Sequence, residues 1–576
     1  MTVAIVAIVG VALVVAATTL APKVGVATPL LLVLLGFLAS LTPWVGHVGV
    51  PPELVLEGIL PPLLYSAAVS TPIMEVRRDF RIISLFSVVL VVASATVVGL
   101  LATVLIPGLP LGVGLALGAV ISPTDPVATS IVRKAHVSSR LVTVLDGESM
   151  LNDASALVLL RAAIAAVGVS VSVWQVAGQF VWAVVAAIVI GYGVGKLNLL
   201  VRAHVSDPNV GVAVSLVVPF LASVPAERIG ASGLVAAVAA GFVTGYGAPH
   251  RIGARDRLTE RTVWSTIELL LESGVFLLTG LELRSLTSDL SNGAGTIGAA
   301  VWIAAVCVAV VLAVRAVFVA WSVWSLALRN RRAPAVREEL TRIQDTIEQG
   351  HVPHRRPPEP KVRRLLHLRR TAPDKEVQLG RWRKALDLRI ADLDYLAAEQ
   401  FGWRDGVMLT WSGLRGAVTV AAVQTLPVDA PSRSLVVLVA VFVAIGTLLV
   451  QGSTLSLVAR LLGLSGHDAE GDESQWVSLQ AELSRAALAR LEEHPSSVAD
   501  AVRERLVMRV EADDDEFGSQ AQREQLRTYR TLRLDLIAAE REALLSIRQS
   551  GTYPSALLDA ALAQLDAEQI GIELRR

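Results

Sequence analysis

The sequence predicts an all-α polytopic membrane protein with about thirteen transmembrane helices and a helical cytoplasmic tail. Of its 576 residues, 53% are hydrophobic and 18% are charged, whereas about a quarter of the residues of a soluble domain are charged. The charge is also uneven, because residues 1–328 contain long apolar runs while 329–404 and 461–576 hold most of the charged side chains. The single cysteine, Cys307, lies within an apolar run and excludes a disulfide framework.

Windows of about 20 apolar residues locate the predicted spans. In chain order they are residues 3–20, 27–42, 52–69, 82–106, 111–132, 144–167, 174–195, 209–224, 231–246, 263–283, 296–328, 406–426 and 434–459. The domain organisation follows from these spans. It comprises a membrane part with spans one to eleven (1–328), a basic cytoplasmic insertion (329–404), spans twelve and thirteen (405–460), and a helical regulatory tail (461–576).

The loops between the spans predict the orientation. Lysine and arginine are concentrated in the odd-numbered loops: RRDFR in the third, RKAHVSSR in the fifth, Lys196 and Arg202 in the seventh, and RIGARDRLTER in the ninth. Since basic loops stay in the cytoplasm, the N-terminus is expected outside and the C-terminus inside. Many arginines and few lysines suggest a GC-rich bacterial genome, so we expect a multi-pass protein of the bacterial inner (plasma) membrane.

Span five, LGVGLALGAVISPTDPVATSIV, is interrupted by two prolines. Pro123 and Pro126 lack an N–H group and therefore leave backbone carbonyls without helical partners. Such carbonyls are tolerated in a membrane only where protein or a wet cavity satisfies them. Thr124 and Asp125 lie between the prolines. Free carbonyls, a hydroxyl and a carboxylate together predict an oxygen-rich environment that suits a small cation.

Span twelve, VMLTWSGLRGAVTVAAV, has a second interruption. Gly413 and Gly416 flank Arg415 near the middle of the apolar run. Spans five and twelve run in opposite directions, and an inverted repeat of spans one to six against spans eight to thirteen would make them counterparts. Broken helices at matching positions of two inverted halves indicate a transporter binding site near the bilayer midplane.

Span six begins with acids, in the stretch DGESMLNDASA. Glu148 and Asn152 are four residues apart, and so are Ser149 and Asp153, so the two pairs occupy adjacent faces of one helix. An arginine at the midplane needs a counter-charge. We therefore predict that Glu148 pairs with Arg415.

Asp153 is then free to face Asp125 across the contact between spans five and six. Two carboxylates brought close together cannot both stay ionised at low cost. We expect Asp153 to hold a proton at acidic pH and a cation at alkaline pH. Asp146, nearer the cytoplasmic end, is expected to cap its helix.

Five segments together resemble the NhaP/NHE-type monovalent cation:proton antiporters. They are ISPTDPVATS, GESMLNDASALVL, AERIGASGLVAAVAAG, VFLLTGLEL and WSGLRGAV, and the likeness covers residues 30–460 apart from the eleventh loop. The resemblance implies a fold of inverted six-helix repeats with two unwound crossing helices. It also implies a homodimer in which a six-helix core moves against a dimerisation domain.

The resemblance assigns roles to single residues. The transported alkali cation would be bound by Asp153, Asp125, Ser149 and Thr124, with Glu148 and Arg415 as a structural charge pair. Asn152 beside Asp153 resembles the Asn–Asp pair of the electroneutral branch, in which one cation exchanges for one proton. The implied function is exchange of sodium, or of lithium or potassium, for protons in pH homeostasis.

Three features leave alternatives open. Glu272 stands where members of the resembled family often have asparagine, and Glu268 lies one turn before it. The two glutamates could shift the ion preference from sodium to potassium, or they could pair with an arginine. The insertion, with HVPHRRPPEPKVRRLLHLRR, could contact anionic headgroups or form a solvated linker. The tail could regulate transport, contact a second subunit, or only add solubility.

Several function classes are disfavoured. The sequence has no glycine-rich nucleotide loop, no His/Cys metal-ligand cluster and no nucleophile triad. We therefore expect no enzyme activity, no cofactor, no nucleotide and no nucleic acid, and as partners only membrane lipid and a second copy. The competing functions are a potassium-selective antiporter, and a cation channel or non-transporting sensor. A channel requires weak binding at several sites rather than one deep site.

Overall fold

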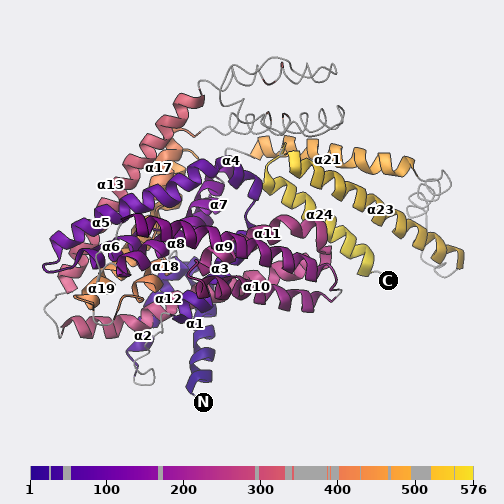
Figure 1. Cartoon of the computed structure of the whole chain (residues 1–576). Helices are drawn as coiled ribbons and strands as arrows, with labels where there is room; N and C mark the ends of the chain where they lie inside the picture. Colours follow the sequence, from indigo (N-terminus) through magenta and orange to yellow (C-terminus); the bar gives the residue numbers. More distant parts are fainter. Residues whose placement is uncertain are drawn as a thin grey trace. The chain divides into compact units, whose positions relative to one another are not determined.

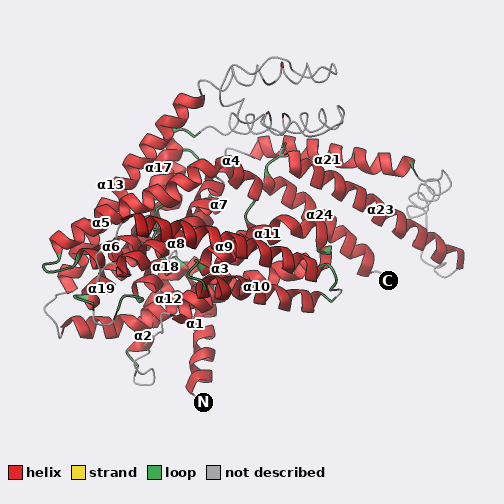
Figure 2. Cartoon of the chain, in the orientation of Figure 1, coloured by secondary structure: helices red, strands yellow, loops and turns green. Residues whose placement is uncertain are grey.

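The computed structural model describes most of the chain. It covers residues 2–24, 27–42, 53–135, 137–165, 173–205, 207–291, 297–330, 401–427, 430–464, 469–493, 520–550 and 552–574, with 340, 342, 386 and 390 as isolated positions. In these residues all regular structure is helical, as predicted (Figures 1 and 2). The basic stretch of the insertion lies outside the described residues.

The chain separates into two compact units. One comprises Met1–Ser322 with Gly402–Asp468, and the other comprises Val323–Phe401 with Ala469–Arg576. The first half of the first unit contains α1 (Thr2–Val24), α2 (Thr28–Ser40), the π-helical turn η1 (Leu54–Ile59), α3 (Leu60–Ser70), α4 (Ile73–Ser84), η2 (Leu85–Leu90), α5 (Val91–Leu105), α6 (Leu111–Ile121), α7 (Val127–Lys134) and α8 (Ser139–Ala165). It continues with α9 (Val173–Arg202), α10 (Pro208–Arg228), α11 (Gly233–Arg251), α12 (Ala254–Ser291), α13 (Ile297–Asn330, whose end belongs to the second unit), α17 (Trp403–Trp411), α18 (Ala417–Val423), α19 (Arg433–Thr447), η3 (Leu448–Gly452) and α20 (Ser453–Leu461).

Every predicted span overlaps one of these helices or a run of consecutive ones. Five helices of the described chain are long and apolar enough to cross a membrane: Met74–Leu105, Gly178–Arg202, Pro208–Arg228, Ile297–Leu328 and Arg433–Leu461. The total of thirteen spans and the inverted repeat stay predictions.

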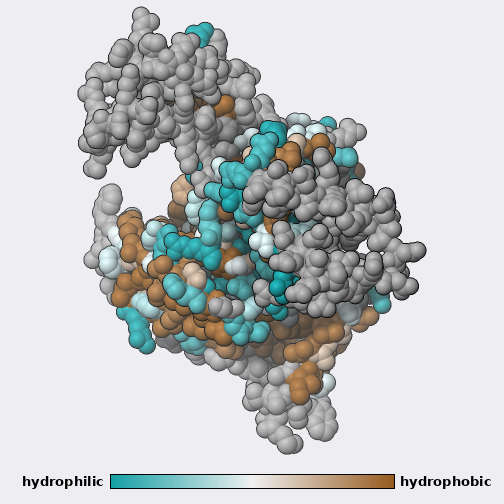
Figure 3. Space-filling view, turned by 90° about the vertical axis from the view of Figure 1, so that its right-hand side faces the viewer, coloured by the Kyte–Doolittle hydropathy of each residue, from teal (hydrophilic) through white to brown (hydrophobic). Residues whose placement is uncertain are grey.

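Large apolar side chains cover much of the surface of the first unit. Val189 on α9 and Trp302 and Val317 on α13 are 66%, 65% and 72% exposed. Figure 3 shows hydrophobic residues over broad areas of the face in view. Apolar surface of this extent, on helices of this length, is typical of contact with lipid.

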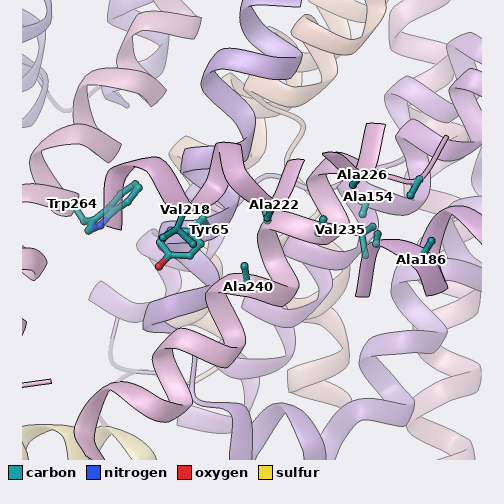
Figure 4. Close-up of a cluster of buried hydrophobic side chains, with 13 residues drawn as sticks. Tyr65, Ala154, Ala186, Val218, Ala222, Ala226, Val235, Ala240 and Trp264 are labelled. Carbon is teal, nitrogen blue, oxygen red and sulfur yellow. The ribbon is translucent and has the colours of Figure 1, made fainter. Parts of the chain in front are cut away.

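Small residues allow the helices of the first unit to pack closely. A Cβ at Gly241 of α11 would lie 2.7 Å from the backbone oxygen of Tyr65 on α3. A buried cluster around the same helices consists mostly of alanine, as Figure 4 shows. Side chains this small let helix backbones approach each other. The cluster includes Ala154 of α8, and therefore fixes α8 beside its neighbours at the residue that follows Asp153.

The second unit contains three well-described helices, α21 (Ala469–Glu492), α23 (Gln520–Ser550) and α24 (Ser555–Leu574). Helix α23 ends at Ser550 and α24 begins at Ser555, with Pro554 directly before it. Their shared apolar core includes Leu479, Ile537 and Leu558. Ion pairs link α23 to α24: Arg533 with Glu568 at 2.8 Å, Arg541 with Asp566 at 3.0 Å, and Arg548 with Asp559 at 3.0 Å.

Candidate ion-binding site

The first interruption separates α6 from α7. Helix α6 ends at Ile121 and α7 begins at Val127, so the predicted proline break lies between them. The N–H of Val127 donates to Asp125 Oδ1 at 2.8 Å. A carboxylate that accepts from the first turn of a helix acts as its cap. Asp125, 7% exposed, is therefore held in place by the start of α7.

The second interruption separates α17, which ends at Trp411, from α18, which begins at Ala417. The two interruptions touch, because the N–H of Asp125 donates to the backbone oxygen of Leu414 at 2.8 Å. Arg415 Nε donates to the oxygen of Ile121, the last residue of α6, at 2.9 Å. A cation at the carboxyl end of a helix is favourable. Each break thus satisfies backbone groups that the other break leaves free.

Gly416 is required by this contact. A Cβ at this position would overlap the carboxylate of Asp125. Gly446, on the adjacent helix α19, has no atom within 4 Å of the position of a Cβ. The two glycines therefore differ in whether a methyl group can be added.

For the cation exchange that the sequence predicts, we expect Gly416→Ala to reduce the rate by about tenfold or more, because the methyl group displaces Asp125 or separates the two breaks. Gly446→Ala is the matched control and is expected to retain activity near that of the wild type. Initial rates of cation-dependent proton flux in proteoliposomes test this. Equal rates in the two variants would mean that Asp125 need not stay at the crossing, which is the contact between the unwound segments 122–126 and 412–416.

Helix α8 contributes the acids that the sequence singles out. Glu148, Ser149, Asn152 and Asp153 are all at most 3% exposed. Asn152 Nδ2 donates to Thr124 Oγ1 at 2.8 Å, and Thr124 Oγ1 donates to Glu148 Oε1 at 3.4 Å. Glu148 and Asn152 therefore share a face of α8 that meets the first break.

The other predicted pair lies on the adjacent face. Asp153 is close enough to Asp125 for the two carboxylates to interact electrostatically. Ser149 Oγ donates to the backbone oxygen of Asp146 at 3.1 Å, within α8. The structure thus brings Asp153, Asp125 and Thr124 to the crossing, whereas the hydrogen bond of Ser149 stays within its own helix.

The predicted pairing of Glu148 with Arg415 is wrong. Arg315 of α13 binds Glu148 instead: its Nη2 donates to Oε2 at 2.9 Å and its Nη1 donates to Oε1. Arg315 Nε also donates to the oxygen of Leu409, at 2.8 Å. The guanidinium group of Arg315 can bind both oxygens of a carboxylate. The side chain of Arg415 instead donates to backbone oxygens at the two breaks, those of Ile121 and Gly413.

The pattern VVLAVRAVFVAW (residues 310–321) could have revealed Arg315. A lone arginine in the middle of an apolar run is costly in a membrane and indicates a buried partner. The run contains no proline or glycine, so nothing in it marks an interrupted span.

The crossing carries one uncompensated negative charge when its acids are ionised. Three buried carboxylates (Glu148, Asp125 and Asp153) and two buried guanidinium groups (Arg315 and Arg415) give −3 + 2 = −1. Charges removed from water are stable only when they are balanced. A single monovalent cation or a single proton is enough to neutralise this group.

Glu272 and Glu268 extend the acidic surface along α12. Glu272, partly exposed, interacts electrostatically with Asp125. Glu268 accepts a hydrogen bond from Ser66 Oγ at 3.4 Å. Within the described residues neither of the two forms an ion pair with an arginine. A further acid therefore lies within electrostatic range of Asp125.

Comparison with known proteins gives a consistent result. The family model described as "Sodium/hydrogen exchanger, transmembrane" matches residues 9–339 and 385–461. An uncharacterised Na⁺/H⁺ exchanger of Mycobacterium tuberculosis is 29% identical over 97% of this chain and 94% of that protein. A sodium, potassium, lithium and rubidium/H⁺ antiporter of Bacillus subtilis is 30% identical over 46% of this chain and 41% of that protein.

A solved structure shares the fold. The sodium proton antiporter MjNhaP1 from Methanocaldococcus jannaschii at pH 8 aligns over 80% of this chain and 100% of that chain, with a TM-score of 0.54 and 15% identity. At this identity the likeness concerns the fold alone.

Proposed function

The chain belongs to the sodium/hydrogen exchanger family of NhaP/NHE-type antiporters, and from that premise we propose that it exchanges one sodium ion for one proton. The proposal describes secondary active transport across the plasma membrane, with Asp153 holding the cation and the proton in turn. The observation that carries it is the single uncompensated charge among the five buried ionisable groups of the crossing. One proton or one alkali cation is enough to neutralise the crossing. Binding of both together would give the crossing a net positive charge.

The ligands that we propose for the cation are oxygen atoms of the crossing. They are the carboxylates of Asp153 and Asp125 and the hydroxyls of Thr124 and Ser149, assisted by backbone oxygens of the two breaks. Hard cations prefer such oxygen ligands. Asn152 positions Thr124 through its hydrogen bond, and the pair of Glu148 with Arg315 stays neutral throughout the cycle.

The exchange is proposed to be electroneutral. The crossing has the same net charge when it holds a proton as when it holds a monovalent cation. The two halves of the transport cycle therefore move equal charge in opposite directions. Alternating access would follow from joint movement of the two breaks, which are hydrogen-bonded to each other through Asp125 and Leu414. A homodimer with a mobile core and a fixed dimerisation domain belongs to the same proposal.

A broader or potassium-preferring exchange is the second candidate. Glu272 adds an acid near Asp125, and the Bacillus subtilis relative is named for four alkali cations. Extra negative charge near a site increases its affinity for cations in general. A ranking of sodium, potassium and lithium by apparent KM distinguishes the two candidates.

We expect sodium, added to proteoliposomes that hold a pH gradient, to change internal pH without generating a membrane potential. Internal pH is followed with a fluorescent indicator and potential with a voltage-sensitive dye. A potential that grows with turnover would reject the electroneutral exchange. Conductance without proton coupling would indicate a channel, and no response to sodium, potassium or lithium would reject the proposed function.

A further inference from the structure

Gln451 has a buried side-chain amide. It lies in the π-helical turn η3, between α19 and α20, and is 1% exposed. Neither its Oε1 nor its Nε2 has a hydrogen-bond partner among the residues that the structure describes. Burial of an unpaired amide costs free energy that an apolar side chain of the same length would not. π-helical turns within helices frequently lie at functional sites.

The neighbours of Gln451 along the helix indicate what it faces. Four residues earlier, Thr447 Oγ1 accepts from the backbone N–H of Arg415 at 3.0 Å. Three residues later, Thr454 Oγ1 accepts from Trp411 Nε1 at 2.9 Å. Both contacts are with the second break, one at each end. Gln451 thus lies between two residues, Thr447 and Thr454, whose side chains both contact the second break or its edge.

The first break has a corresponding arrangement. Asn152 lies on α8, which follows the broken pair α6 and α7, and donates from Nδ2 to Thr124. Gln451 lies in the run α19–η3–α20, which follows the broken pair α17 and α18, and its amide forms no hydrogen bond to a described residue. The unwound peptide holds Asp125 through the oxygen of Leu414. A shift of Leu414 therefore either moves the backbone of Asp125 or breaks this hydrogen bond.

We propose that Gln451 is a positioning residue whose amide bonds the unwound segment Ser412–Gly416 in a different conformation of the transport cycle from the one seen here. This inference rests on the proposed exchange function. A group that is unpaired in one conformation and paired in another favours the second by the free energy of its hydrogen bonds. Gln451 would thus set the balance between two conformations of the second break.

The test replaces Gln451 with methionine in the full-length protein. Gln451→Met keeps an unbranched side chain and removes the amide, and Leu455→Met, at a fully buried position one turn away, controls for methionine packing. We expect the maximal rate of sodium-dependent proton flux to fall about fivefold or more in Gln451→Met only, since one net hydrogen bond is lost from one state. Its thermal midpoint in detergent should equal or exceed that of the wild type, because no bond is broken in the conformation seen here.

Two results would overturn the inference. An unchanged rate with an equal or higher thermal midpoint would mean that the amide destabilises the protein and has no role in transport. A lowered thermal midpoint would mean that the amide already forms a hydrogen bond in the conformation seen here. Gln451→Glu adds a pH signature: a protonated carboxyl both donates and accepts, so exchange should be retained at acidic pH and lost at alkaline pH. If the wild type itself shows no cation-dependent flux, the proposed function fails and not this inference alone.

Discussion

Replacing Asp153 with asparagine is expected to abolish cation-dependent proton flux while leaving the protein folded. The amide can neither release a proton nor supply the missing negative charge, so the crossing no longer needs a cation for neutrality. An uncharged side chain is also easier to bury than a carboxylate, and the thermal midpoint in detergent should not fall. The measurement is the initial rate of internal pH change in proteoliposomes after addition of sodium, with protein-free vesicles as the background.

Asp146→Asn is the matched control on the same helix. The prediction that Asp146 caps its helix is wrong, because α8 begins at Ser139. Asp146 instead pairs with Arg133 at 2.7 Å, and the two side chains are 20% and 65% exposed. Surface pairs of this kind contribute about 0–1 kcal/mol, so this variant should retain most of the exchange.

Asp125→Asn tests the second acid. Asparagine still caps a helix well, so α7 should stay intact while the charge is lost. Flux that persisted in the double variant Asp153→Asn, Asp125→Asn would show that the exchanged ions bind elsewhere.

The interruptions could be predicted from the sequence because proline and glycine act locally. Pro123 and Pro126 remove N–H groups wherever they lie, and Gly416 permits an approach that no other residue allows. The two faces of α8 could be predicted for a similar reason, since spacing along a helix determines which side chains share a face. These features therefore follow from a few consecutive residues.

The partner of Glu148 could not be predicted in this way. Arg315 lies 167 residues away, and the choice between it and Arg415 depends on how α13 and α17 approach α8. The same limit applies to Gln451, because whether its amide has a partner among the described residues depends on tertiary packing and not on the adjacent sequence. Helix α12 extends over 38 residues, beyond the predicted span 263–283, because its charged first turns lie outside a hydropathy window.

Removing either partner of the buried pair of Glu148 with Arg315 is expected to destabilise the protein by about 3–5 kcal/mol, because the remaining charge stays buried without compensation. Both side chains are at most 2% exposed. Glu148→Gln and Arg315→Met are the single variants. The double variant should recover much of the loss, since an uncharged pair has no ion to desolvate.

A double-mutant cycle separates this pair from the one that the sequence suggested. The coupling between Glu148 and Arg315, measured from denaturant unfolding in mild detergent, should exceed about 2 kcal/mol for directly bonded buried charges. The coupling between Glu148 and Arg415, from Arg415→Met in the same scheme, should stay below about 1 kcal/mol. Arg415→Met alone still destabilises, because Arg415 donates to Ile121 and Gly413 oxygens at the breaks. If the larger coupling belonged to Arg415, the arrangement of α13 beside α8 would be wrong, and with it the charge count on which the one-for-one exchange depends.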